Sequence, residues 1–278
     1  MPFPLLNKSL MEQKQQLNLI LRSDLITRRL FWCLLGFELF IVFLDVFVNH
    51  YNWSSVGAIR RMVNITREDS LSNWFSSLQA IVVGAVLWLT SVGVNAQMRD
   101  NYYKWKSYGW AGIGSFFIYL GIDDAIKFHE RMGTAFKVLF FDNDDTFGTG
   151  VLVRAYDAFP SYTWQLVFGP VFVSIGIFMI WFLWKELSSR KLWYWFLVGI
   201  SLYAVAVGLD FVEGLDGSQY EEMGITDFFS TSNHRIRHMS KALEEFLEML
   251  GTTIFLIIFL KNIFRLSGEW RIHITNNT

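Results

Sequence analysis

Residues 243–264 read LEEFLEMLGTTIFLIIFLKNIF, an apolar run with three glutamates near its start. A helix of about 20 mostly apolar residues is long enough to cross a lipid bilayer. Glutamates in such a run are costly unless they face the interior of the protein or a water-filled cavity. This stretch therefore predicts a bundle of membrane-spanning helices, and it also indicates where a functional site should be sought.

Five earlier runs have the same character. The six expected spans are residues 30–49, 74–95, 108–128, 162–184, 192–213 and 243–264. They are continuously apolar rather than alternating, which favours helices over a membrane β-barrel. We therefore expect an all-α, polytopic six-helix transmembrane bundle over residues 30–264. A cytoplasmic amphipathic segment (1–29) should precede it, and a cytoplasmic tail (265–278) should follow.

The composition supports this class. Of the 278 residues, 53% are hydrophobic and 18% aromatic, and the net charge is −1. Disordered chains lack aromatic residues and carry high net charge, so disorder is excluded. A pI near 6.5 offers no basic footprint for nucleic acid. The expected partners are the lipid bilayer and either another membrane protein or a second copy of the chain, with no nucleic acid.

The charges divide between the two faces of the predicted bundle. Face A comprises residues 1–29, 96–107, 185–191 and 261–278, and face B comprises the opposite loops and helix ends. Face A holds 14 Lys and Arg and five acidic residues, whereas face B holds ten and 18. The positive-inside rule places face A, and with it both termini, in the cytoplasm. We expect a bacterial inner-membrane protein with this orientation.

Acidic residues and histidines gather where spans meet face B. The third span ends with Asp123, Asp124, His129 and Glu130, and the fifth ends with Asp210 and Glu213. Asp123 and Glu130 are seven residues apart, so we expect them on one face of one helix. The sixth span begins with His234, His238, Glu244, Glu245 and Glu248, most of which form one stripe with Lys241 at helical spacing.

This combination of side chains predicts a metal site. Imidazole together with carboxylate suits Zn, Fe or Mn, and helical bundles hold di-iron and di-manganese centres with similar inward-facing residues. The expected ligands are Asp123, Glu130, Asp210, His238, Glu245 and Glu248. Further candidates are Asp124, His129, Glu213, His234 and Glu244. Structural ion pairs, for example between Glu213 and Lys241, are the alternative interpretation.

Two acidic residues lie inside the first span. Glu38 and Asp45 are placed where a path for protons or cations from face B toward face A would run. Three functions therefore remain open. The first is a metal-dependent membrane enzyme, a hydrolase or an oxidase of a lipid-like or small substrate. The second is a proton- or cation-coupled transporter, and the third is a non-catalytic subunit of a membrane complex.

Two segments carry a family resemblance. The pattern Asp-Asp-x4-His-Glu (123–130), together with Glu-Glu-x2-Glu-Met-x-Gly (244–251), resembles uncharacterised bacterial multi-pass membrane proteins. The resemblance implies no known activity, but it implies that these residues act together.

Glycines in two spans predict close helix packing. Small residues allow the backbones of neighbouring membrane helices to approach. The expected positions are Gly109, Gly112 and Gly114 in the third span and Gly169 and Gly176 in the fourth.

Overall fold

The computed structural model describes residues 23–97, 104–140, 159, 162, 164–187, 189–214 and 233–266. Within these ranges every regular element is helical. The elements are α1 (Ser23–Asp45), the π-helix η2 (Val46–His50), α2 (Gly57–Val63), α3 (Leu71–Gln97), α4 (Lys104–Ile126), α5 (Phe128–Phe140), α7 (Trp164–Glu186), α8 (Arg190–Glu213) and α11 (Asn233–Leu266). Most of the expected N-terminal segment (1–29) and nearly all of the expected tail (265–278) lie outside the described residues.

Among the residues that the structure describes, five helices are long and apolar enough to cross a membrane. They are Ser23–His50, Leu71–Gln97, Trp164–Glu186, Arg190–Glu213 and Arg237–Leu266. The third expected span lies in α4, which is not among them. Glycine, serine, tyrosine and tryptophan interrupt the apolar residues of α4, and Asp123 and Asp124 lie close to its end.

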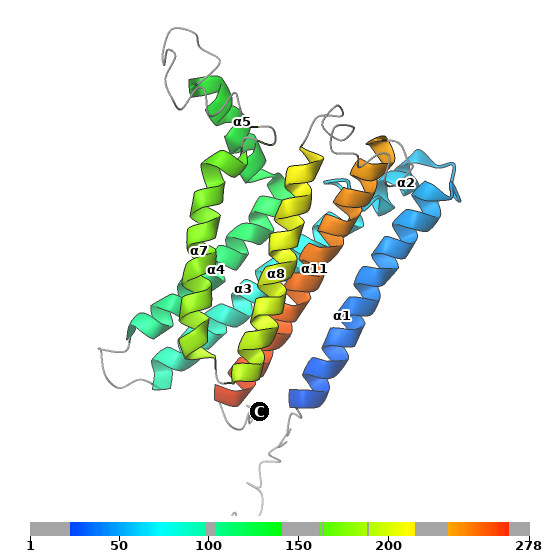
Figure 1. Cartoon of the computed structure of the whole chain (residues 1–278). Helices are drawn as coiled ribbons and strands as arrows, with labels where there is room; N and C mark the ends of the chain where they lie inside the picture. The colour runs from blue at the N-terminus through cyan, green and yellow to red at the C-terminus, as the bar shows by residue number, and fades with distance from the viewer. Residues whose placement is uncertain are drawn as a thin grey trace, which may run out of the picture.

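The long helices run alternately up and down (Figure 1). The helix α11 contacts α8, α3 and α1, while α4 packs along α3 and α7 packs against α5, α8 and α4. Most contacts of α1 with the other long helices are made with α11. The start of α1 and the end of α11 lie at the same end of the bundle (Figure 1).

Glycines bring α3 and α4 together. A Cβ atom added at Gly84 of α3 would lie 2.6 Å from the carbonyl oxygen of Gly114, and one added at Gly121 would lie 2.5 Å from that of Ser77. No larger residue fits these positions without a backbone shift. Gly109 is also crowded, because its added Cβ would lie 2.2 Å from the Phe182 ring. The expectation was wrong for Gly112, Gly169 and Gly176, where nothing lies within 4 Å.

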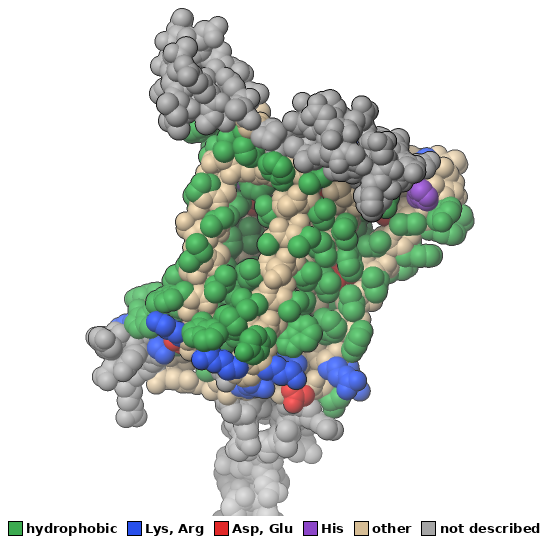
Figure 2. Space-filling view, viewed as in Figure 1, with side chains coloured by type: hydrophobic (Ala, Val, Ile, Leu, Met, Phe, Trp, Pro, Cys, Tyr) green, Lys and Arg blue, Asp and Glu red, His purple; other side chains and the backbone are tan. Residues whose placement is uncertain are grey.

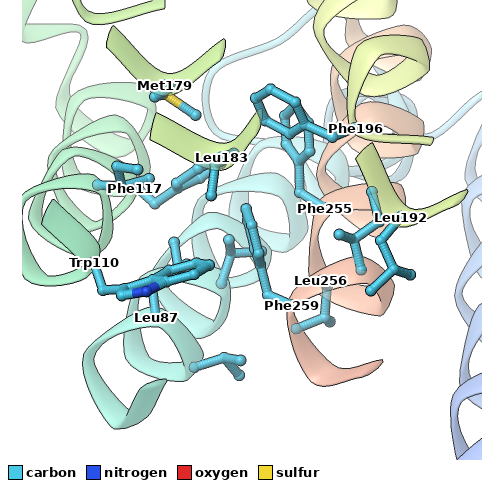
Figure 3. Close-up of a cluster of buried hydrophobic side chains, with 14 of the residues drawn as sticks. Leu87, Trp110, Phe117, Met179, Leu183, Leu192, Phe196, Phe255, Leu256 and Phe259 are labelled. Atoms are coloured by element: carbon cyan, nitrogen blue, oxygen red, sulfur yellow. The ribbon is translucent and has the colours of Figure 1, made fainter. Parts of the chain in front are cut away.

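The apolar core lies toward face A. Trp110, Phe117, Phe182, Phe255 and Phe259 are at most 2% exposed, and their rings meet mainly edge to face. Figure 3 labels all of these residues except Phe182. Edge-to-face pairs suit the charge distribution of aromatic rings. The buried acidic residues, in contrast, lie in the middle of the bundle and at the face B end.

The positively charged side chains also gather at one end of the bundle. Figure 2 shows Lys and Arg side chains gathered at the end where α1 begins, below a broad band of hydrophobic side chains. That end is face A of the sequence analysis.

Candidate functional site

Three carboxylates converge between the last turn of α8 and the first half of α11. Asp210, Glu213 and Glu244 each offer one oxygen atom, and these atoms all lie within 4.8 Å of one another. Asp210 and Glu244 are buried, and Glu213 is partly buried. We refer to Asp210, Glu213 and Glu244 as the carboxylate trio. It forms because the end of α8 and the start of α11 meet at face B.

Lys241 is the counter-ion of this group. Its Nζ lies 2.7 Å from Glu244 Oε1 and 3.7 Å from both Glu213 Oε2 and Glu245 Oε1. Glu244 and Glu245 follow Lys241 by three and four residues, so one turn of α11 brings all three together. A single ammonium group is thus shared by three carboxylates, which leaves the group with excess negative charge.

Buried oxygens in the trio lack hydrogen-bond partners. Glu244 Oε2 and Glu213 Oε2 have none within the part of the chain that the structure describes. Asp210 is better satisfied, since Gln165 Nε2 donates to its Oδ2 over 3.0 Å. Buried polar atoms in proteins are nearly always paired. Glu213 Oε2 has only the 3.7 Å ion pair with Lys241 and Glu244 Oε2 has no hydrogen bond, so both oxygens are positions at which a cation would be stabilised.

Tyr162 lies beside the trio. Partial burial, together with the negative charges of Glu213 and Asp210, raises the pKa of the Tyr162 hydroxyl to about 12. The phenol is therefore held in its neutral form near the carboxylates, where it can act as a hydrogen-bond donor.

Lys127 is a second cation near this group. Burial alone would lower the pKa of its ammonium group, but the charges of Glu245, Glu130 and Asp124 outweigh burial and raise the pKa. Asp124 is also held by α3, since Ser76 Oγ and Ser77 Oγ both donate to its Oδ2. The end of α4 is thereby tied to both α3 and the acidic face of α11.

The backbone turns sharply at Lys127, which has φ 53°. This turn ends α4 and begins α5, so Asp123 and Glu130 do not lie on one continuous helix, and the expectation of a shared helix face was wrong. The turn lets His129 fold back onto Asp123. The His129 backbone N–H donates to Asp123 Oδ1 over 2.8 Å, and the ring Nδ1 bonds to Asp123 Oδ2. Trp164 packs edge-on against the imidazole, with ring centroids 4.4 Å apart.

A second histidine and aspartate join α1 to α11. His238 Nε2 lies 3.1 Å from Asp45 Oδ2. Asp45 Oδ1 also accepts from Asn49 Nδ2 over 2.9 Å and from the Ile65 backbone N–H over 3.4 Å. His238 therefore faces α1 rather than the trio. The side chain of His234 lies outside the described residues.

Glu38 lies in the middle of the bundle and is fully buried. Gln79 Nε2 of α3 donates to Glu38 Oε1 over 3.0 Å, and Thr253 Oγ1 of α11 donates to the same oxygen. Glu38 Oε2 and Gln79 Oε1 have no partner among the described residues. This polar group links α1, α3 and α11 in the middle of the bundle.

Of the six residues expected as metal ligands, only Asp210 falls in the trio, where it meets the further candidates Glu213 and Glu244. Glu245 contacts Lys241, and Glu248 interacts electrostatically with Glu244 and Glu245. Several partners were not singled out from the sequence, namely Ser76, Ser77, Gln79, Tyr162, Gln165 and Thr253. Most are polar residues in apolar runs, and that signal could have identified them.

These features define an all-helical protein with membrane-type helices and a cluster of buried carboxylates at one end. The chain belongs to the family described as a domain of unknown function (DUF8692), whose family model matches residues 26–263. No curated protein and no solved structure matches the chain.

Proposed function

We propose that the protein crosses the membrane six times, with α4 as the additional span and face A in the cytoplasm. Support comes from the position of α4 alongside α3 (Figure 1) and from the Lys and Arg residues gathered at face A (Figure 2). The test starts from Cys33→Ser, which removes the single cysteine. In intact cells an impermeant thiol reagent should label Ser54→Cys and should not label Lys191→Cys. The reverse pattern would contradict the orientation.

We propose further that the carboxylate trio binds one divalent metal ion. The observation that carries this proposal is that Asp210, Glu213 and Glu244 bring oxygen atoms within 4.8 Å of one another, while two buried oxygens accept no hydrogen bond from the described residues. An all-oxygen set of ligands suits Mn²⁺ among the metals expected from the sequence, whereas Zn²⁺ and Fe²⁺ favour an added imidazole. His129 and His238, the two described histidines expected as ligands, are each bonded to an aspartate outside the trio.

With this metal, the function that the geometry supports best is a metal-dependent membrane enzyme. The substrate would be a lipid-like or small molecule that reaches face B, and hydrolysis is the favoured reaction. A bound metal would lower the pKa of its water. The His129–Asp123 pair has the arrangement of a general base oriented by a carboxylate, and Glu130, the residue after His129, lies within electrostatic reach of Glu213.

Metal titration of the purified protein tests the proposal. Mn²⁺ should bind at one site per chain, and Glu244→Gln or Asp210→Asn should weaken it by about tenfold or more. Asp69→Asn is the matched control, because Asp69 pairs with Arg61 in an exposed position away from the trio. Unchanged affinity in Glu244→Gln and Asp210→Asn would overturn the metal site.

A proton- or cation-coupled transporter is the second candidate, and the polar group around Glu38 favours it. Glu38 and Asp45 lie at successive depths on α1, and each is hydrogen-bonded to α11. In proteoliposomes with an internal pH dye, Glu38→Gln should abolish proton flux if this function holds. Equal flux in wild type and Glu38→Gln would exclude Glu38 as a carrier. The non-catalytic subunit is less well supported, since Asp123, Asp210 and Glu245 are buried rather than displayed for docking.

A further inference from the structure

An apolar groove lies between α7 and α8 toward face A. It has a volume of about 410 Å³ and is lined by Ile177, Ile180, Trp181 and Trp184 of α7 and by Trp193 of α8. Its lining is almost wholly apolar. Trp184 and Trp193 meet edge to face, with ring centroids 4.3 Å apart. The groove faces outward from the bundle at the depth where tryptophans of membrane proteins meet lipid headgroups.

Two positively charged side chains lie over the faces of tryptophans in this groove. Lys185 Nζ lies 4.2 Å from the centre of the Trp181 ring, and Arg190 Cζ lies 3.8 Å from the centre of the Trp184 ring. A cation over an indole face is attracted to the ring but keeps its hydrogen-bond donors free. The groove therefore ends in two oriented positive charges.

Neither charge is neutralised within the described ranges. The adjacent carboxylate, Glu186, is bonded to Lys106 at 2.8 Å. The helix α8 begins at Arg190, and its N-cap residue Ser189 makes no side-chain capping bond. The first amides of a helix carry partial positive charge and bind phosphate. Lys185, Arg190 and the start of α8 thus present positive charge beside the tryptophans that line the groove.

We propose that this groove binds one anionic phospholipid. Its acyl chain would lie against the isoleucines and tryptophans, and its phosphate would lie between Lys185 and Arg190 at the start of α8. The positive charges of Lys185 and Arg190 favour an anionic lipid over other occupants. A basic site between helices at the cytoplasmic leaflet matches an anionic headgroup, whereas a choline headgroup would place a third cation there. A partner helix would need an acidic side chain at the same depth in the membrane. This inference is independent of the metal site.

The experiment compares lipids on the purified full-length protein. Native mass spectrometry in detergent is used with phosphatidylglycerol, with phosphatidylcholine of the same acyl chains, and with inorganic phosphate alone. Wild type should retain one phosphatidylglycerol in preference to the other two. Lys185→Gln combined with Arg190→Gln should weaken retention about 20- to 30-fold, which corresponds to about fivefold for each cation removed.

The matched control is Arg28→Gln combined with Arg29→Gln, which removes two exposed cations at the same face from α1. This control should retain the lipid as wild type does. Trp184→Ala should weaken retention of phosphatidylglycerol without changing the oligomeric state.

Three results would overturn the proposal. They are equal retention of both phospholipids, equal losses in the two double variants, and a loss of oligomeric state in Trp184→Ala that indicates a second copy in the groove. All variants are first compared with wild type in lipid-free thermal unfolding. A variant that unfolds early is replaced by Lys185→Gln or Arg190→Gln alone.

Discussion

Asp45 and His238, which are 193 residues apart in the chain, are joined by a hydrogen bond of 3.1 Å between Oδ2 and Nε2. The bond connects α1 to α11 at the face B end of the bundle. It gives His238 a structural partner, although the residue's position on α11 made it an expected metal ligand. This bond and the hydrogen bonds of Glu38 hold α1 against its neighbours, together with the packing of Ile41 against Met249.

Replacing Asp45 should loosen α1. Asp45→Asn weakens the bond to His238 and removes the negative charge of the carboxylate that accepts a hydrogen bond from Asn49. Hydrogen bonds to charged groups contribute about 1.5–3 kcal/mol, so the unfolding free energy should fall by about that amount. Thermal unfolding in detergent measures it, with the exposed Asp24→Asn on the same helix as control. Equal stability of the two variants would contradict a structural role for the pair.

Replacing Lys241 should expose the cation affinity of the carboxylate trio. Lys241→Met leaves Glu213, Glu244 and Glu245 without their shared ammonium group. Removing one partner of a buried ion pair costs about 3–5 kcal/mol, so the metal-free variant should unfold at a lower temperature.

Millimolar Mn²⁺ should restore much of the stability of Lys241→Met, because the metal replaces the lost positive charge. It should raise the unfolding temperature of wild type by a smaller amount. Differential scanning fluorimetry with and without Mn²⁺ measures this. A variant that Mn²⁺ does not stabilise more than wild type would argue against a cation site at the trio.

The close approach of α3 and α4 predicts that the stability of the protein depends strongly on side-chain size at Gly84. Gly84→Ala should destabilise the protein by about 1–3 kcal/mol, because the added methyl group meets the Gly114 carbonyl oxygen. Gly93→Ala is the matched control on the same helix, where nothing lies within 4 Å and alanine favours the helix. Thermal unfolding distinguishes them, and equal effects would mean that α3 and α4 are farther apart.

The environment of Tyr162 predicts a titration far above that of an ordinary tyrosine. Burial and the charges of Glu213 and Asp210 raise its pKa to about 12, compared with about 10 for a free side chain. The difference in absorbance at 295 nm between wild type and Tyr162→Phe should therefore develop near pH 12. Glu213→Gln removes one negative charge and should move the titration to lower pH.

The raised pKa of Tyr162 also makes the stability of the protein depend on pH. The folded protein holds the Tyr162 proton more tightly than the unfolded chain does. Its contribution to stability is therefore fully present below about pH 10 and is lost as the pH rises through about 12. Ionisation of Tyr162 at an ordinary pH would show that its hydroxyl is not close to the trio.

Hydropathy was sufficient to predict the helical class, because the lipid environment forces long apolar runs into helices. Three expected spans (74–95, 192–213 and 243–264) lie within α3, α8 and α11, and the other three overlap most of α1, α4 and α7 but extend beyond the ends of these helices. The difficult case was α4, which faces its neighbours with glycines and aromatic residues and so has less apolar character than a lipid-facing helix. Because α4 packs against α3 over much of its surface, it needs fewer apolar residues than a helix that faces lipid, and its hydropathy is lower.

The site was harder to predict for a geometric reason. The stripe on α11 placed His238 on the same helix as Glu244 and Glu245, but spacing within one helix does not show which neighbouring helix each residue faces. Similarly, the seven-residue spacing of Asp123 and Glu130 predicts a shared face only on a continuous helix, and the left-handed backbone at Lys127 breaks that helix. A lysine in this conformation gives no signal in the sequence, whereas a glycine there would have done so.

The bond between Thr253 and Glu38 has a consequence for biosynthesis. The two residues are separated by 215 positions, so α1 enters the membrane long before its partner on α11 exists. Until then Glu38 can be paired only with Gln79 of α3 or remain exposed to lipid and water. In a chain that stops before α11 is complete, the Glu38 carboxylate therefore lacks its Thr253 hydrogen bond and the cover of α11, and this difference chemically distinguishes unfinished copies from the complete bundle, where Glu38 is fully buried.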